Sequence, residues 1–308
     1  MLSQQEFIMT RNVTIAATQF ACSWDLSANL EKAEALIRRA ASEGAQIILI
    51  QELFKAPYFC IDQHPDHRAL AETLEECELI KRFQALAREL DVVLPCSFFE
   101  RHNNAFYNSM AMVDAGGEVL GVYRKTHIPN GPAYQEKHFF TPGDTGFKVW
   151  KTKYAKIGLG ICWDQWFPEA ARCMALMGAE ILLYPTAIGS EPDFRQQDSQ
   201  PHWTMTQRGH AAANIMPVIA SNRIGTEKSK YIPDYEMTFY GSSFITDQFG
   251  ELVAQADKTS ECIITHTFDL EAINHIRDQW VVFRDRRPEM YTAILTSDGE
   301  TIHHAVRF

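Results

Sequence analysis

Three residues of this 308-residue chain could together carry out acyl transfer: Glu52, Lys125 and Cys162. A cysteine thiol can attack a carbonyl carbon, and a carboxylate can take the thiol proton. A lysine ammonium can stabilise the oxyanion that forms. Each residue alone is uninformative, because exposed glutamates and lysines usually only face solvent. The set becomes informative because each member follows a predicted strand.

Those three strands are predicted at Ile47–Ile50, Glu118–Tyr123 and Ile157–Ile161. Binding and catalytic groups of α/β folds gather at the ends of strands, because the loops there leave room for a ligand. The three polar residues are therefore expected to meet at one edge of the fold, although they lie far apart in the sequence.

The segment Lys156–Glu169, KIGLGICWDQWFPE, explains how Cys162 would be held. It reads as a strand with glycines that let other backbone pack close, then a turn at Trp163–Trp166, then a helix at Ala170–Met177. A cysteine on such a turn lies near a helix N-terminus, whose dipole favours a thiolate. This segment alone fits two interpretations of Cys162, a nucleophile and a small buried apolar residue.

The remaining elements predict a mixed sheet system covered by helices, an α/β fold. Further strands are expected at Val13–Gln19, Val92–Phe99, Phe106–Val113, Phe147–Trp150, Ile181–Tyr184, Val218–Ser221, Gly241–Thr246, Leu252–Gln255 and Cys262–Phe268. Helices are expected at Leu30–Ala41, capped by Ser27 or Asn29, and at Thr73–Glu89, His202–Asn214 and Leu270–Arg277. Residues 42–52 resemble residues 176–186, which suggests a duplicated arrangement or only two similar helix-to-strand junctions.

Composition excludes several classes of function. A formal net charge of -10 disfavours binding to nucleic acid. Neither GxGxxG nor GxxxxGK[ST] occurs, and no apolar run is long enough to span a membrane. The pair His64 and His67 is predicted to lie in a solvated loop rather than to bind metal. We expect no metal and no cofactor.

Seven cysteines without a CxxC motif predict free thiols and a cytoplasmic protein. Residues 1–10 are polar and are predicted to form a flexible leader rather than a signal peptide. The length suits a single domain over residues 11–308. Its basic, aromatic tail, residues 280–308, is expected to take part in oligomer contacts.

Five motifs resemble the Glu-Lys-Cys signature of the nitrilase superfamily of carbon–nitrogen hydrolases. They are ATQF, IILIQELF around Glu52, YRKTHIPNG around Lys125, YQEKHFFTPGDTGF around Glu136, and GICWDQWFPE around Cys162. The resemblance implies a four-layer αββα sandwich that pairs into an αββα–αββα homodimer or a larger homo-oligomer. It also implies a cysteine thioester intermediate.

Three segments resemble the branch of N-carbamoylputrescine amidohydrolases: residues 160–192, the segment through His202-Trp203, and FRDRRPEMY. The implied reaction converts N-carbamoylputrescine, a cationic ureido compound, to putrescine, CO2 and ammonia. The alternatives are a β-ureidopropionase-type or ω-amidase-type hydrolase, acyl transfer to an amine, and a non-catalytic assembly protein.

Two residues just after Cys162 support this branch over relatives that bind a carboxylate. Gln165 and Trp166 stand where relatives that hydrolyse N-carbamoyl amino acids are expected to carry an arginine for the substrate carboxylate. Neither residue can neutralise a carboxylate, whereas both can line a passage for an alkyl chain, and an indole can contact a cation.

The supporting residues follow from the same resemblance. The backbone N–H of Trp163 is expected to join Lys125 at the oxyanion, and Glu136 to orient Lys125 or a substrate nitrogen. Glu191, Asp193 or Asp198 is expected to bind the distal ammonium of the substrate. The alternative is that these three carboxylates only face solvent in a loop. Asn130 stands where the branch often carries Asp. The predicted substrate-binding set is Tyr58, Asn130, Trp166 and Glu191.

Overall fold

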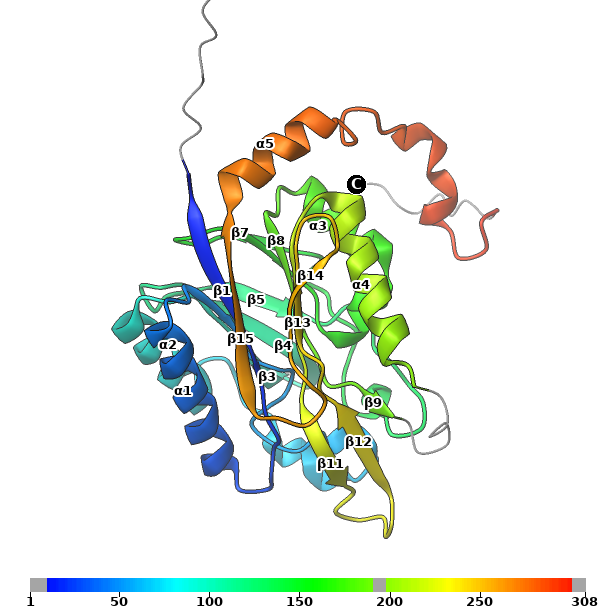
Figure 1. Ribbon diagram of the computed structural model, residues 1–308. Helices are drawn as coiled ribbons and strands as arrows, with labels where there is room; N and C mark the ends of the chain where they lie inside the picture. Colours follow the sequence, from blue (N-terminus) through cyan, green and yellow to red (C-terminus); the bar gives the residue numbers. More distant parts are fainter. Residues whose placement is uncertain (1–9, 191–197, 301–308) are drawn as a thin grey trace, which may run out of the picture.

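The computed structural model describes residues 10–190 and 198–300, and its centre is a pair of β-sheets packed face to face (Figure 1). Helices α1 (Leu26–Ser42) and α2 (Glu78–Leu90) cover the outer face of the first sheet. Helices α3 (Pro168–Leu176) and α4 (Gln200–Asn214) cover the outer face of the second. The predicted four-layer αββα sandwich is confirmed.

The first sheet has the strand order β15-β1-β2-β3-β4-β5. Two groups of three strands join because the amide of Ile48 donates to the Val93 carbonyl (3.1 Å) and the amide of Val93 donates to the Gln46 carbonyl (2.8 Å). The bounds are β1 Asn12–Gln19, β2 Ile47–Leu49, β3 Leu94–His102, β4 Ala105–Val113, β5 Val119–Arg124 and β15 Cys262–Asp269.

The second sheet has the order β14-β13-β10-β8-β7-β6, with parallel pairing of β10 to β8 and of β8 to β7. The bounds are β6 Val149–Lys151, β7 Lys156–Leu159, β8 Ile181–Pro185, β10 Val218–Ser221, β13 Phe244–Thr246 and β14 Leu252–Gln255. Each sheet thus has parallel strands at its centre and antiparallel strands at its edges.

The similarity between residues 42–52 and 176–186 has a structural counterpart. The first segment leads from α1 into β2, and the second leads from α3 into β8. In both, a glycine in the left-handed region ends the helix, Gly44 and Gly178, each with φ +91°. Only glycine adopts this conformation without strain, so both helices end by the same device.

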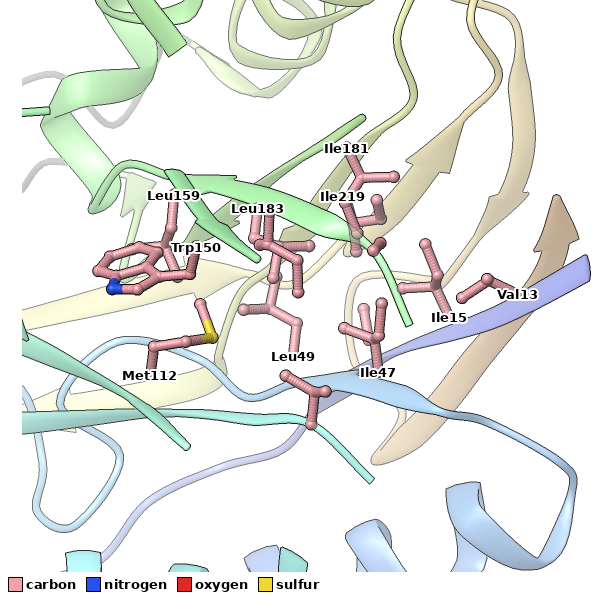
Figure 2. Packing of buried hydrophobic residues seen from close by; sticks show 14 of the residues in the cluster. Val13, Ile15, Ile47, Leu49, Met112, Trp150, Leu159, Ile181, Leu183 and Ile219 are labelled. Atoms are coloured by element: carbon pink, nitrogen blue, oxygen red, sulfur yellow. The ribbon is translucent and has the colours of Figure 1, made fainter. Parts of the chain in front are cut away.

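Between the two sheets lies a core of branched and aliphatic side chains (Figure 2). Ile15, Ile47 and Leu49 point from the first sheet toward Leu183 and Ile219 of the second, and all five are fully or almost fully buried. Strands that are buried on both faces read as unbroken apolar runs, which is why the sequence predicts them well. This packing fixes the distance between the strand ends that carry the polar residues.

Two helix starts differ from the prediction. Helix α1 begins at Leu26, because Asp25 rather than Ser27 or Asn29 caps it by accepting the Ala28 amide. Helix α2 begins only at Glu78 rather than at Thr73. A small sheet was missed: β9 (Gly189–Ser190), β11 (Ile224–Lys228) and β12 (Glu236–Tyr240). β9 and most of β11 lack apolar side chains, and the alternation in β12 extends only from Glu236 to Phe239, which is too short to predict a strand.

Beyond β15, helix α5 (Leu270–Trp280) and two 3-10 turns lead the chain away from the sandwich (Figure 1). Residues 1–9 of the predicted leader and residues 301–308 of the tail lie outside the described residues. No helix within the described ranges is long and apolar enough to cross a membrane.

The glycines of β7 make room for side chains, not for other backbone as the sequence suggested. A Cβ on Gly158 would lie 2.7 Å from Leu182 Cδ2 and 3.1 Å from Met174 Cβ. The strand and helix α3 can therefore approach closely only while this position has no side chain.

We predict that Gly158→Ala lowers the free energy of unfolding by about 1–3 kcal/mol, because overpacking forces the neighbours apart. Urea unfolding measures this. The matched control is Gly209→Ala in helix α4, where a Cβ meets nothing within 4 Å. That variant should be neutral or slightly stabilising, since alanine favours helix over glycine. Equal stability of the two variants would contradict the packing argument.

Candidate active site

The fold brings together Glu52, Lys125 and Cys162 from three strand ends. Glu52 follows β2 and Lys125 follows β5, both in the first sheet, and Cys162 follows β7 of the second sheet. The three groups lie close enough to affect one another's ionisation. Glu52 and Cys162 raise the pKa of Lys125, whereas Glu52 raises and Lys125 lowers the pKa of Cys162. The site therefore spans both sheets, and the sheet-to-sheet packing determines its geometry.

Lys125 lies between two carboxylates and is fully buried with both. Its Nζ donates to Glu52 Oε1 (2.9 Å) and to Glu136 Oε1 and Oε2 (2.9 and 2.7 Å). Burial by itself lowers the pKa of Lys125, but the two carboxylates outweigh this and hold the pKa well above its usual value. The ammonium is thus charged at neutral pH.

The two carboxylates differ in their surroundings. Asn108 Nδ2 donates to Glu52 Oε1 (2.6 Å), and Glu52 Oε2 has no hydrogen-bond partner among the described residues. Glu136 accepts from the Tyr58 hydroxyl (2.6 Å) as well as from Lys125. Burial raises the pKa of Glu136 to about 7, against the opposing effect of the Lys125 ammonium. One oxygen of Glu52 is therefore free to exchange a proton.

Cys162 is held in a strained conformation at the start of the 3-10 helix η4 (Cys162–Trp166). Its φ of +42° lies in the left-handed region, which a residue with a Cβ rarely adopts. Strain of this kind persists where the surrounding structure imposes it, and it is concentrated at functional sites. The Sγ atom lies 3.9 Å from the carbonyl of Ala187, in a side chain that is almost fully buried.

The helix dipole, expected to favour a thiolate at this position, is opposed by two effects. Burial and the nearby Glu52 carboxylate raise the pKa of Cys162 far above that of a free thiol, and Lys125 only partly opposes them. A dipole worth less than about 1 kcal/mol cannot offset desolvation of this size. The resting residue is a thiol and needs a base.

Asp164 fixes the turn that carries Cys162. This fully buried carboxylate accepts hydrogen bonds from the Ile161 amide (2.9 Å) and the Tyr123 hydroxyl (2.7 Å). It also accepts from the amide of His127 (3.0 Å) and lies 2.7 Å from His127 Nδ1. Because Tyr123 and His127 flank Lys125, a single side chain ties the cysteine turn to the lysine strand.

A pocket of about 260 Å³ opens onto Cys162. The other lining residues are mainly aromatic or apolar: Pro129, Tyr134, Trp163, Trp166, Ile188, Ser199 and His202. The indole Nε1 of Trp166 and the Oγ of Ser199 are buried without a hydrogen-bond partner among the described residues.

Two members of the predicted substrate-binding set do not line this pocket. Tyr58 lies behind the site, where it donates to Glu136, and Asn130 is exposed beside the lining residue Pro129. Gln165 also differs from the expectation that it lines a passage: it is fully buried, and its Oε1 accepts from Thr186 Oγ1 (3.3 Å) and Gln207 Nε2 (3.4 Å).

The predicted carboxylates for a distal ammonium have different outcomes. Glu191 and Asp193 lie outside the described residues. Asp198 is exposed, forms an ion pair with Lys258 (3.0 Å) and is not part of the pocket lining. Ile188 and Ser199, which flank the segment that contains Glu191, both line the pocket.

The prediction of a solvated loop around His64 and His67 is wrong for His67. Its ring is buried, stacks on Trp24 and lies 3.0 Å from Asp62 Oδ1. Aromatic neighbours from distant segments enclose it, which the local sequence cannot reveal. Across residues 10–190 and 198–300, no group of three or more potential metal ligands is placed to hold an ion.

Residues 14–278 match the sequence model of the family described as carbon-nitrogen hydrolase. The chain belongs to the carbon-nitrogen hydrolase family. Its five motifs and its αββα sandwich thus have a common explanation.

This carbon-nitrogen hydrolase is 56% identical to an N-carbamoylputrescine amidase of Arabidopsis thaliana, over 94% of this chain and 97% of the relative. It is 53% identical to a citrullinase of Francisella tularensis, over 92% of this chain and 98% of the relative. A crystal structure of a carbon-nitrogen hydrolase from Helicobacter pylori G27 superposes with a TM-score of 0.87 at 39% identity, covering 93% and 99% of the two chains.

Several polar residues of the hydrolase were not found from the sequence. Asn108, Asp164, Arg223 and Glu227 are buried and hydrogen-bonded to the site or to its loops. Asp164 carried a local signal, since it stands two residues after Cys162 in the same turn. The others lie on strands or loops that only the tertiary structure brings close.

We predict that Asp164→Asn lowers the free energy of unfolding by about 1–3 kcal/mol, because the new amide group would face hydrogen-bond donors. Turnover should fall as well, since the cysteine turn loses its anchor. Urea unfolding and ammonia release measure the two effects. The control is Asp257→Asn, which changes an aspartate that also accepts several hydrogen bonds, from Thr259 and Ser260, but lies away from the site. Equal turnover of both variants would contradict the prediction.

Proposed function

We propose that this carbon-nitrogen hydrolase cleaves the ureido C–N bond of N-carbamoylputrescine, giving putrescine, CO2 and ammonia. The observation that carries the proposal is the buried set Glu52, Lys125 and Cys162 beside a pocket of aromatic side chains. The 56% identity to a plant N-carbamoylputrescine amidase supports the choice of substrate.

In the first half of the reaction, Glu52 takes the proton of the Cys162 thiol, and the sulfur attacks the ureido carbon. Lys125 and the Trp163 N–H stabilise the resulting oxyanion, and such a donor is typically worth about 3–4 kcal/mol. The amide of Trp163 suits this role because the first N–H groups of a helix have no acceptor within it. The protonated Glu52 then gives its proton to the departing nitrogen, and the C–N bond breaks.

In the second half, Glu52 takes a proton from water, and the hydroxide adds to the thioester carbon. The C–S bond breaks, and the thiolate of Cys162 regains its proton from Glu52. The product is a carbamic acid, which loses CO2 to leave the second amine or ammonia. Glu136 holds the Lys125 ammonium through two hydrogen bonds and keeps it aimed at the oxyanion.

The pocket suits an unbranched cationic chain. Its volume of about 260 Å³ falls just below the roughly 300–1,000 Å³ typical of small-molecule sites. Trp163, Trp166 and Tyr134 present rings that attract a cation. Glu191, three positions after the lining residue Ile188 in the sequence, is proposed to bind the distal ammonium.

Citrulline is the second candidate substrate, because a citrullinase is 53% identical to this chain. Citrulline differs from N-carbamoylputrescine only by a carboxylate on the carbon that bears the distal ammonium. Among the described residues that line the pocket there is no lysine or arginine to neutralise that carboxylate. A buried, unpaired carboxylate is costly, so the described part of the lining supports the diamine derivative as the substrate.

We predict that kcat/KM for N-carbamoylputrescine exceeds that for citrulline and for N-carbamoyl-β-alanine by at least about 100-fold, equal to about 2.7 kcal/mol. Ammonia release with each substrate measures this. Added amine acceptors in the same assay test for acyl transfer in place of hydrolysis. A preference for either carboxylate-bearing substrate would contradict the proposal.

Catalytic variants provide the control for this assay. Cys162→Ala should show no thioester chemistry, and Glu52→Gln should bind substrate but lose at least about 1,000-fold in kcat, since the thiol would lack its base. Retained turnover of Cys162→Ala would refute the mechanism whatever the substrate preference.

We also propose that the tail, residues 280–308, contacts a second copy of the chain. Its described part exposes Trp280, Met290, Ile294 and Leu295, each at least 58% accessible, beside a groove of about 980 Å³ next to α3 and α4. Apolar surface of this extent is typical of an interface. We propose a cytoplasmic location as well, because none of the seven cysteines is paired in a disulfide.

We predict that the double change Ile294→Ser and Leu295→Ser lowers the oligomeric state, because it removes apolar contact area from the tail. Size-exclusion chromatography with light scattering measures the mass. The control is Ile232→Ser, which changes an exposed isoleucine between β11 and β12. A wild-type chain that elutes as a monomer would refute the oligomer proposal.

A further inference from the structure

A second buried ion pair lies next to the proposed catalytic groups. Arg223, between β10 and β11, is fully buried, and its Nη1 donates to both carboxylate oxygens of Glu227 on β11, at 2.8 and 3.0 Å. The guanidinium lies over the ring of Phe239, 5.3 Å from its centroid. Taking two charges out of water costs several kcal/mol for each ion, so this pair needs an explanation beyond stability.

The pair contacts both ends of one short segment, residues 52–58. At the first end, Arg223 Nη2 donates to the main-chain carbonyl of Glu52 (2.7 Å), and Nη1 reaches the carbonyl of Ala56 (3.3 Å). At the second end, Glu227 Oε2 accepts from the amide of Tyr58 (2.5 Å). A single ion pair thus holds the proposed base and the tyrosine behind Glu136.

The backbone of this segment is strained at the position that the arginine holds. Leu53 has a φ of +50°, in the left-handed region that a bulky residue adopts at a cost of roughly 1–2 kcal/mol. The Leu53 amide is fixed by Ser97 Oγ (2.8 Å), and the preceding carbonyl is fixed by Arg223. The bend that directs the Glu52 side chain toward Lys125 therefore depends on contacts from other strands.

The contacts form a closed circuit of polar groups. From Arg223 it runs through Glu227 to Tyr58, and the Tyr58 hydroxyl then donates to Glu136. Lys125 bridges Glu136 and the Glu52 carboxylate. The circuit closes where the Glu52 carbonyl accepts from Arg223. A displacement of the ion pair would therefore move both carboxylates that hold the lysine.

We infer that the Arg223–Glu227 ion pair is a positioning device for the reaction, holding Glu52 and, through Tyr58, Glu136 in the geometry that Lys125 and Cys162 require. The inference rests on the proposed function, because it assigns a purpose to the pair through the role of Glu52. Neither Arg223 nor Glu227 lines the pocket at Cys162. Both act through other residues and do not touch substrate.

The first test uses the double variant Arg223→Met and Glu227→Gln, which removes both charges and leaves an acceptor for the Tyr58 amide. Removing both avoids a lone buried charge, which would destabilise the fold. We expect kcat to fall by about 100-fold, the loss that a displacement of about 1 Å can cause. KM should change by less than about threefold, because the pocket is untouched.

A second variant, Arg223→Lys, keeps the charge but cannot make all the contacts of the guanidinium fork. It should fold and lose about 10-fold in kcat with KM unchanged. The matched control is Arg277→Met. Arg277 also donates to main-chain carbonyls, those of Ala179 and Ile215, but it lies on α5 away from the site. That variant should lose stability and keep its kcat.

Folded Arg223 variants with wild-type kcat, or with the same kcat as Arg277→Met, would overturn the inference. So would a loss confined to KM. If the double variant does not fold, Arg223→Lys decides alone by the same criteria. Glu52→Gln, assayed in parallel, distinguishes two failures. An active Glu52→Gln refutes the proposed role of Glu52 as the base, whereas an inactive Glu52→Gln beside fully active Arg223 variants refutes only the positioning role. Wild-type protein that does not release ammonia from N-carbamoylputrescine refutes the proposed function itself.

Discussion

The site depends on the ammonium of Lys125, which is buried between the carboxylates of Glu52 and Glu136. An unpaired ammonium could not remain charged there, and unpaired carboxylates could not remain ionised. The three groups therefore stabilise one another's charges. Two of them stand at the ends of β2 and β5, so the pairing is possible only where these strands end at the same edge.

A buried charge cluster leaves the nucleophile a thiol at rest. Burial and Glu52 raise the pKa of Cys162, and the same Glu52 has one carboxylate oxygen free to take the proton. This arrangement withholds a reactive thiolate until a substrate carbonyl is present to receive it. The strained φ of Cys162, held by the hydrogen bonds of Asp164, presents the sulfur to the pocket.

The proposed choice of substrate depends on other residues than the charged cluster. The charged cluster can act on any carbonyl that a thiol can attack. The aromatic pocket between Tyr134 and His202 instead selects the part of the substrate that lies beyond the carbonyl. Two relatives of nearly equal identity, an amidase for N-carbamoylputrescine and a citrullinase, illustrate the separation. A common reaction centre can serve both reactions.

The sequence by itself predicted the family, the αββα layers and the proposed catalytic residues Glu52, Lys125 and Cys162, because strands and strand-end motifs are local patterns. Only the tertiary structure revealed the desolvation that raises the pKa of Cys162, the burial of Gln165 and His67, and the anchors Asp164 and Arg223. Each of these depends on desolvation or on partners distant in the chain, such as Arg223 and Glu52, which are 171 positions apart. Short-range sequence patterns carry no record of such contacts.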